Sequence, residues 1–179
     1  AAGNSLVEAI NADTKIGVFS YDPNQTGSLP SPSAGQMSDF SSWGPTPELT
    51  LKPEITAPGG NIYSSTQMSG ETSQYGLMSG TSMAAPHMSG ASALIKEYVE
   101  EAYPNLDPLA VENLVNSLAM STAVPVIESG ATDDASPITY YSPRKQGAGL
   151  VDVFNAITSE GYLSVDGSNR PKAELGSKA

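Results

Sequence analysis

The residues that could do chemistry gather in one segment, residues 80–90, which reads Gly-Thr-Ser-Met-Ala-Ala-Pro-His-Met-Ser-Gly. Ser82 follows a glycine-led turn at the start of a predicted helix, where Gly80 leaves room for a substrate carbonyl to approach the backbone. Amides in the first helical turn lack an intrahelical acceptor, so the amide of Ser82 could bind an oxyanion, aided by the helix dipole. A serine hydroxyl needs a base within hydrogen-bond reach before it attacks a carbonyl. The segment therefore fits either an ordinary helix N-cap or an acyl-transfer nucleophile.

Other residues with functional side chains are better explained as structural. His87, the sole histidine, lies five residues after Ser82 on the same predicted helix. That spacing is about one and a half turns, so we expect its ring to point away from the attacking hydroxyl. Asp39, shortly before Trp43, fits a turn or cap residue better than a catalytic acid. The pair Asp133–Asp134 in a polar loop could bind calcium, but neighbouring loop acids are more often only solvated. Trp43 and the methionines are expected in the core or in a pocket wall.

A long helix is predicted to carry the nucleophile. Its apolar residues recur at helical spacing, with charged residues on the opposite face. The apolar set is Leu94, Ile95, Tyr98, Val99 and Ala102, and the charged set is Lys96, Glu97, Glu100 and Glu101. Because proline has no amide hydrogen, it is best tolerated in a first helical turn. We therefore expect Pro86 to lie in that turn and the helix to begin near Ser82 or Met83.

Shorter elements are predicted around this helix. Asp107 as N-cap and Pro108 at the first helical position predict a second helix. Its apolar stripe is Val111, Leu114, Val115 and Leu118, and a third helix after residue 149 has the stripe Leu150, Val153, Phe154 and Ile157. Helical spacing near residues 6–10 and strand patterns at 15–20, 163–165 and 172–175 complete the expected elements. Four prolines between residues 37 and 59 exclude a long helix there.

Composition restricts the classes of function. The 179 residues include 19 acidic and 8 basic side chains, for a formal net charge of −11. Nucleic acid or an anionic membrane surface would require clustered cations, so neither is an expected partner. The absence of cysteine excludes disulfides and thiolate metal sites. No apolar run approaches about 18 residues, so no membrane span is predicted. Seventeen glycines and fourteen prolines predict a globular, turn-rich chain.

The segment 80–90 carries the nucleophile signature Gly-Thr-Ser-Met-Ala-Ala-Pro-His-x-x-Gly of the subtilisin-like serine proteases, the subtilase family. Four other segments resemble family segments: Asp-Phe-Ser-Ser-Trp-Gly-Pro at 39–45, Lys-Pro-Glu-Ile-Thr-Ala-Pro-Gly at 52–59, the extended approach at 75–79 and the closing segment at 147–153. The resemblance covers residues 37–158. It implies an α/β fold, the C-terminal portion of a subtilisin-like domain with a mostly parallel sheet and flanking helices, whose first strands lie in another segment or chain.

The same resemblance implies roles for particular residues. Ser82 would be the nucleophile of a serine endopeptidase, with its backbone amide in the oxyanion hole. Ser79, Gly80 and Thr81 would contact the substrate, no metal ligand or organic cofactor is implied, and structural calcium stays open. In family order, the triad Asp and His and the oxyanion Asn precede the nucleophile motif, which alone is present here. We therefore expect an N-terminal segment of the same protease to supply them, and the chain by itself to be inactive. The alternative is a non-catalytic fragment or pseudoenzyme that acts as a protein-binding module.

The flanking segments resemble lactocepin-type cell-envelope proteinases, in which a protease-associated domain is inserted before the nucleophile motif. Residues 1–33 would be the end of that insert, residues 34–158 the C-terminal part of the catalytic domain, and residues 159–179 the start of a fibronectin type III-like domain. This implies a secreted or cell-envelope-attached enzyme of a Gram-positive-type bacterium, acting on proteins or peptides. A start in mid-domain fits self-processing, limited proteolysis or a designed truncation equally. A dominant role of residues 1–33 as an interaction module is a further alternative.

Overall fold

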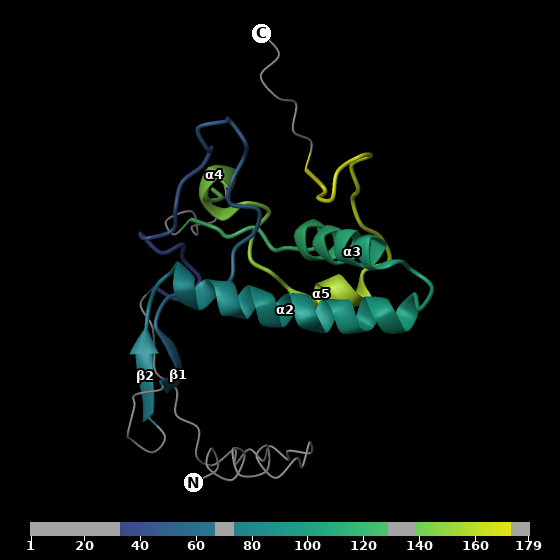
Figure 1. The fold of residues 1–179 in the computed structure, drawn as a ribbon. Coiled ribbons are helices and arrows are strands. Elements are labelled where there is room, and N and C mark those ends of the chain that lie inside the picture. Colours follow the sequence, from purple (N-terminus) through teal and green to yellow (C-terminus); the bar gives the residue numbers. More distant parts are fainter. Residues whose placement is uncertain (1–32, 67–73, 129–138, 173–179) are drawn as a thin grey trace. The chain divides into compact units, whose positions relative to one another are not determined.

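The computed structural model describes residues 33–66, 74–128 and 139–172 (Figure 1). In chain order these ranges hold strands β1 (Ile62–Thr66) and β2 (Gln74–Met78) and helices α2 (Thr81–Ala102), α3 (Pro108–Ser121), α4 (Pro143–Gln146) and α5 (Val153–Thr158). They divide into two compact units. The first contains the hairpin of β1 and β2, and the second contains residues 35–60 together with the described helices. Helices combined with a small sheet agree with the predicted α/β class.

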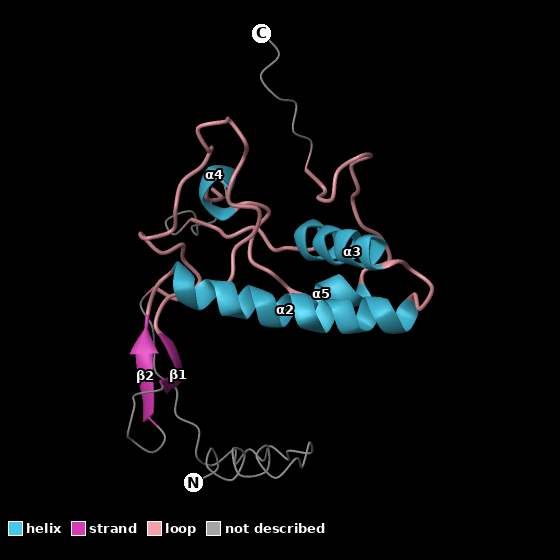
Figure 2. Ribbon diagram, viewed as in Figure 1, coloured by secondary structure: helices cyan, strands magenta, loops and turns pink. Residues whose placement is uncertain are grey.

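The core of the second unit lies where α2, α3 and α5 pack together (Figure 2). Its buried side chains are Ile95 and Val99 from α2, Val111, Val115, Leu118 and Ala119 from α3, and Ala156 from α5. Ile95 and Val99 are fully enclosed, as expected for residues four apart on one helix face. The predicted stripe of α3 is confirmed, whereas on α2 Leu94 is 56% exposed and leaves the stripe.

The start of α3 follows from its local sequence, as predicted. Asp107 is the N-cap, and its Oδ1 accepts hydrogen bonds from the amides of Leu109 and Ala110, both at 3.0 Å. Pro108 occupies the first helical position, where a missing amide hydrogen costs nothing. Two of the amides that a helix start leaves without a partner are therefore satisfied.

The third helix, α5, begins later than predicted. Asp152 is its N-cap and accepts a hydrogen bond from the amide of Asn155 at 2.8 Å. Leu150 therefore precedes the helix instead of belonging to its stripe, and Phe154 is 71% exposed. Ala156 is fully buried in their place. Val153 and Ile157 are partly buried against the same core, as predicted, and the small Ala156 is the fully buried residue of this six-residue helix.

Extended backbone replaces helix between residues 37 and 59, as the prolines predict. Thr56 pairs with Leu150 in an isolated parallel bridge, and Leu150 pairs with Val124 in an antiparallel one. Since β1 and β2 run antiparallel, this bridge is the one case of parallel pairing within the described ranges. The mostly parallel sheet of the predicted fold is not formed by these residues alone.

The hairpin of the first unit has a defined register. Tyr63 pairs with Leu77 and Ser65 with Tyr75. The rings of Tyr63 and Tyr75 stack, with centroids 5.7 Å apart and an interplanar angle of 26°. Diagonal aromatic pairs of this kind stabilise two-stranded ribbons. The extended conformation predicted for residues 75–79 is confirmed for residues 75–78.

Some sequence predictions for the chain ends are wrong, and others fall outside the described residues. Residues 163–165 form no strand, because Leu163 instead donates its amide to the hydroxyl of Ser121 at 2.9 Å and the backbone turns at residues 166–167. The predictions for residues 6–10, 15–20 and 173–175 lie outside the described ranges. Among the helices that are described, none is both long and apolar enough to cross a membrane.

Candidate active site

The turn before α2 is built around Gly80. This residue is the N-cap, with φ 155° and ψ 164°, a conformation that residues with a Cβ rarely adopt. Its carbonyl accepts hydrogen bonds from the amides of Met83 and Ala84, at 3.0 and 3.4 Å. The helix therefore begins at Thr81, slightly earlier than predicted, and Ser82 is its second residue.

Ser82 is exposed in the first turn of α2, next to Thr81, which is also exposed. Within the described part of the chain, the amides of Thr81 and Ser82 have no hydrogen-bond acceptor, as expected at a helix start. Because α2 is 22 residues long, its dipole adds partial positive charge at this end. The position fits a nucleophile with an oxyanion donor in its own backbone, and both roles stay predictions on geometry alone.

Pro86 lies deeper in the helix than predicted. It is the sixth residue of α2 and so belongs to the second turn, which makes the expectation of a first-turn proline wrong. Its missing amide hydrogen leaves the carbonyl of Ser82, four residues earlier, without a backbone donor from the helix. An interior proline costs roughly 3 kcal/mol, and the helix continues because its distal turns are fixed by the buried Ile95 and Val99.

Gly59 holds the turn at Gly80 from outside the helix. Its carbonyl accepts the amide hydrogen of Gly80 at 2.8 Å. A Cβ on Gly59 would lie 2.8 Å from the carbonyl oxygen of Gly80 and 3.1 Å from the Cβ of Ala84, so only glycine fits without a shift. Sequence reasoning matched residues 52–59 to the family but missed this contact. The Gly-Gly pair at residues 59–60 was the available signal, since a paired glycine often marks close backbone approach.

The only histidine of the sequence is engaged within its own helix. Nδ1 of His87 lies 3.1 Å from the carbonyl oxygen of Met83, so Nδ1 donates its proton and the ring is oriented along α2. This agrees with the structural role predicted for His87. Asp39 lies exposed in a turn closed by the amide of Ser41 on the carbonyl of Ser38 at 3.1 Å, as predicted for a turn residue. An imidazole base for Ser82 is therefore not found in the described residues.

Trp43 was predicted in the core or in a pocket wall, and the first of these two positions is wrong. It is 58% exposed, and the charged ends of Arg144 and Lys145 lie over its ring at 5.9 and 5.6 Å. Two cation–π contacts stabilise an aromatic ring that is not enclosed. The methionines differ in burial, since Met37 is buried and Met78 is 51% exposed.

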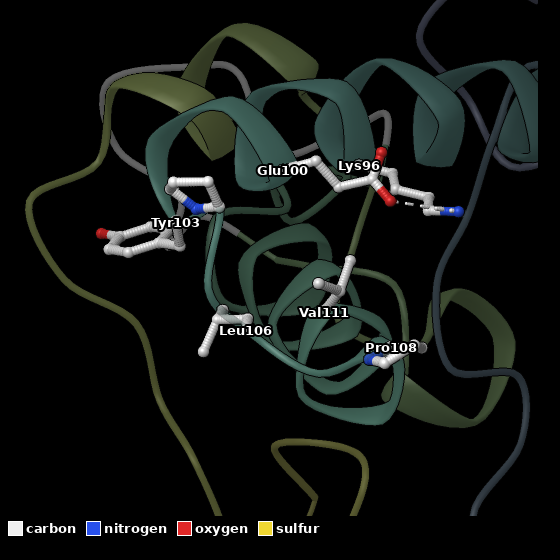
Figure 3. A pocket seen from close by; sticks show the side chains of 7 residues that line it. Lys96, Glu100, Tyr103, Leu106, Pro108 and Val111 are labelled. Carbon is white, nitrogen blue, oxygen red and sulfur yellow. Dashed lines mark ion pairs between the residues drawn. The ribbon is translucent and has the colours of Figure 1, made fainter.

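The described residues contain no group of three or more potential metal ligands. The Asp133–Asp134 pair lies outside these ranges. A pocket of about 330 Å³ lies instead at the far end of α2 (Figure 3). It is lined by Lys96, Glu100, Tyr103, Pro104, Leu106, Pro108 and Val111. With a rise of 1.5 Å per residue, Lys96 lies about 21 Å along the helix from Ser82, so the pocket is separate from the candidate site.

Comparison with known sequences identifies the class of protein. The sequence profile of the subtilase family matches residues 1–154, and the chain belongs to this family. The PI-type proteinase of Lactococcus lactis subsp. cremoris and the PII-type proteinase of Lacticaseibacillus paracasei are each 38% identical to it over 167 residues, 87% of this chain and 8% of the relative. The C5a peptidase of Streptococcus pyogenes is 36% identical over 147 residues, 82% of this chain and 12% of the relative.

These relatives confirm the predicted lactocepin-type subgroup. The chain spans about a tenth of their length.

Proposed function

We propose that this chain is the nucleophile-bearing part of a subtilisin-like serine endopeptidase. The observation that carries the proposal is the position of Ser82. It is exposed in the first turn of a long helix, inside an intact family signature, with its own amide without an acceptor in the described residues. Membership of the subtilase family and 36–38% identity to proteinases and a peptidase support it.

The proposed reaction is acyl transfer. Ser82 Oγ attacks the scissile carbonyl carbon while a histidine from an N-terminal segment takes the hydroxyl proton. The amide of Ser82 and an asparagine of that segment hold the oxyanion. The same histidine protonates the leaving amine as the C–N bond breaks. Water then hydrolyses the ester, releasing the acid and restoring Ser82.

The substrate is proposed to bind as an extended peptide along residues 75–80. β2 supports this because it is a strand whose single neighbour within the described ranges is β1. A strand with one unpaired edge can accept a peptide by backbone hydrogen bonds. Ser79, Gly80 and Thr81 would then be the residues next to Ser82 that contact the substrate.

The wider setting is also part of the proposal. The partner is an N-terminal segment of the same protease with the Asp and His motifs, and the substrates are proteins or peptides. Residues 1–33 would end an inserted protease-associated domain, and residues 159–179 would begin a fibronectin type III-like domain. Secretion or attachment to the cell envelope is proposed from the similarity to bacterial proteinases of this subgroup.

Labelling with a fluorophosphonate tests the proposal in the full-length protease. We expect covalent modification of Ser82, and its loss together with proteolysis in the Ser82→Ala variant. Ser89→Ala is a matched control, because Ser89 is also exposed on α2 but bonds only to the carbonyl of Ala85 at 3.1 Å. A natively folded protein that is never labelled would support the pseudoenzyme alternative. Proteolysis that persists in Ser82→Ala would refute the assignment.

A further inference from the structure

One carboxylate in the second unit is surrounded by three cations. Oε1 of Glu54 accepts hydrogen bonds from Lys52 and Arg170 and lies 3.4 Å from Nζ of Lys172. The side chains of Glu54 and Lys172 are 20% and 11% exposed, whereas those of Lys52 and Arg170 are 40% and 38% exposed. The pair with Lys172 is therefore the one shielded from water, and a shielded, hydrogen-bonded pair fixes side chains more strongly than an exposed pair does.

The charge state of Glu54 follows from two opposed effects. Burial by itself raises the pKa of the carboxyl group. The hydrogen bond from Lys52 and the positive charges of Arg170, Lys52 and Lys172 outweigh burial, so the pKa is lowered overall. Glu54 is therefore ionised at neutral pH, with cations from two distant parts of the sequence bound to it.

The cluster joins residues 162–172, here called the returning segment, to the rest of the unit. Arg170 and Lys172 belong to this segment, and Nζ of Lys172 also donates to the carbonyl of Leu51 at 2.7 Å. The segment is further held against α3, where Leu163 donates its amide to Ser121 at 2.9 Å and Asn169 accepts from Asn116 at 3.4 Å. Its ion pairs to Glu54 come from Arg170 and Lys172.

Backbone hydrogen bonds hold the stretch 54–59 near both of its ends. The carbonyl of Glu54 accepts from the amide of Ala148 at 2.9 Å. The amide of Thr56 donates to the carbonyl of Gly149 at 2.8 Å, and its carbonyl accepts from the amide of Val151 at 2.9 Å, so residues 54–56 are fixed along the single segment 148–151. Three residues later, the carbonyl of Gly59 holds the amide of Gly80. The stretch 54–59 thus connects the ion cluster with the residue that precedes Thr81 and Ser82.

We propose that Glu54 is a positioning residue for Ser82: by binding Arg170 and Lys172 it clamps the returning segment onto residues 51–59, the stretch that holds the turn at Gly80. This rests on the proposed function, because positioning matters only if Ser82 is the nucleophile. The returning segment therefore helps to hold the turn at Gly80 in place. Loosening it would shift the attacking hydroxyl without touching any group in the reaction.

Glu54→Gln in the full-length protease tests the clamp, since glutamine keeps the shape and removes the charge. We expect labelling of Ser82 by fluorophosphonate to slow roughly three- to tenfold, the size of a partly buried ion pair. The amide hydrogen exchange of Gly80 and trypsin cleavage after Lys172 should both accelerate. Glu48→Gln is the matched control, because Glu48 is exposed in the neighbouring loop and forms no ion pair in the described residues.

A second route keeps the test decisive if Glu54→Gln fails to fold. The double variant Arg170→Gln/Lys172→Gln removes the partners from the other side, and its effect on labelling and Gly80 exchange should match that of Glu54→Gln and not add to it. A folded Glu54→Gln or double variant with wild-type labelling and wild-type Gly80 exchange overturns the inference. If the wild-type protein is never labelled, the proposed function fails, while Gly80 exchange still decides whether the clamp exists.

Discussion

Replacing Gly59 by alanine should misplace the nucleophile turn without altering a reacting group. The new Cβ would lie 2.8 Å from the carbonyl oxygen of Gly80, a backbone atom that no side-chain rotation can move aside. To reach an ordinary contact of 3.4 Å, the turn must retreat by about 0.6 Å. Since misplacement by about 1 Å can cost about a hundredfold in rate, we expect about a tenfold loss in labelling of Ser82. The overpacking should also lower the free energy of unfolding by about 1–3 kcal/mol.

The assay compares the rate of fluorophosphonate labelling in the full-length protease with the free energy of unfolding from urea titration. Gly90→Ala is the control on the same helix, because a Cβ there meets nothing within 4 Å. It should leave labelling unchanged and raise helix stability by roughly 0.5–1 kcal/mol. If folded Gly59→Ala is labelled within about twofold of the wild-type rate, the contact between Gly59 and Gly80 does not position Ser82.

Three further outcomes are expected. Asp107→Ala removes the acceptor for the amides of Leu109 and Ala110 and should cost about 1 kcal/mol in urea-induced unfolding; an unchanged midpoint would show that the cap contributes nothing. Ile95→Ala, at a fully buried position, should cost about 2–5 kcal/mol and Ile95→Val only about 0.5–1.5 kcal/mol, so equal losses would contradict the packing described here. Because the pKa of Glu54 is lowered in the folded protein from an ordinary value of 4.5, its contribution to stability is complete above that value and is lost as pH falls through the lowered pKa. Wild-type stability should therefore fall more steeply than that of Glu54→Gln below pH 4.5, and parallel curves would refute the pairing.

The elements that sequence reasoning predicted well are those whose signals are local. The helix α3 has its cap at Asp107, its proline at the first position and its apolar residues within a single stretch, so every determinant lies within a few residues. The apolar face of α2 around Ile95 and Val99 could be predicted for the same reason. The position of Ser82 at a helix start likewise followed from the glycine before it and the periodic residues after it.

The features that were missed depend on contacts between distant residues. Pro86 is tolerated in a second turn because buried side chains further along α2 hold the helix, and no local rule contains that stabilisation. Trp43 was expected in the core or in a pocket wall, but Arg144 and Lys145, a hundred residues later, stabilise it at the surface. The contact between Gly59 and Gly80 is invisible to periodicity, because neither glycine carries a side chain whose spacing could reveal it.

The residues around Ser82 meet some requirements of the proposed reaction and not others. Orientation of the hydroxyl and an amide for the oxyanion are both provided by backbone, through Gly59, Gly80 and the first turn of α2. A base for proton transfer is not provided, because the one histidine ring of the sequence is hydrogen-bonded to the carbonyl of Met83 in its own helix. The proposed reaction therefore assigns the base to another segment, which would dock against the turn at Gly80. On this proposal the chain by itself is inactive, since an oriented serine without a base does not attack an amide at an appreciable rate.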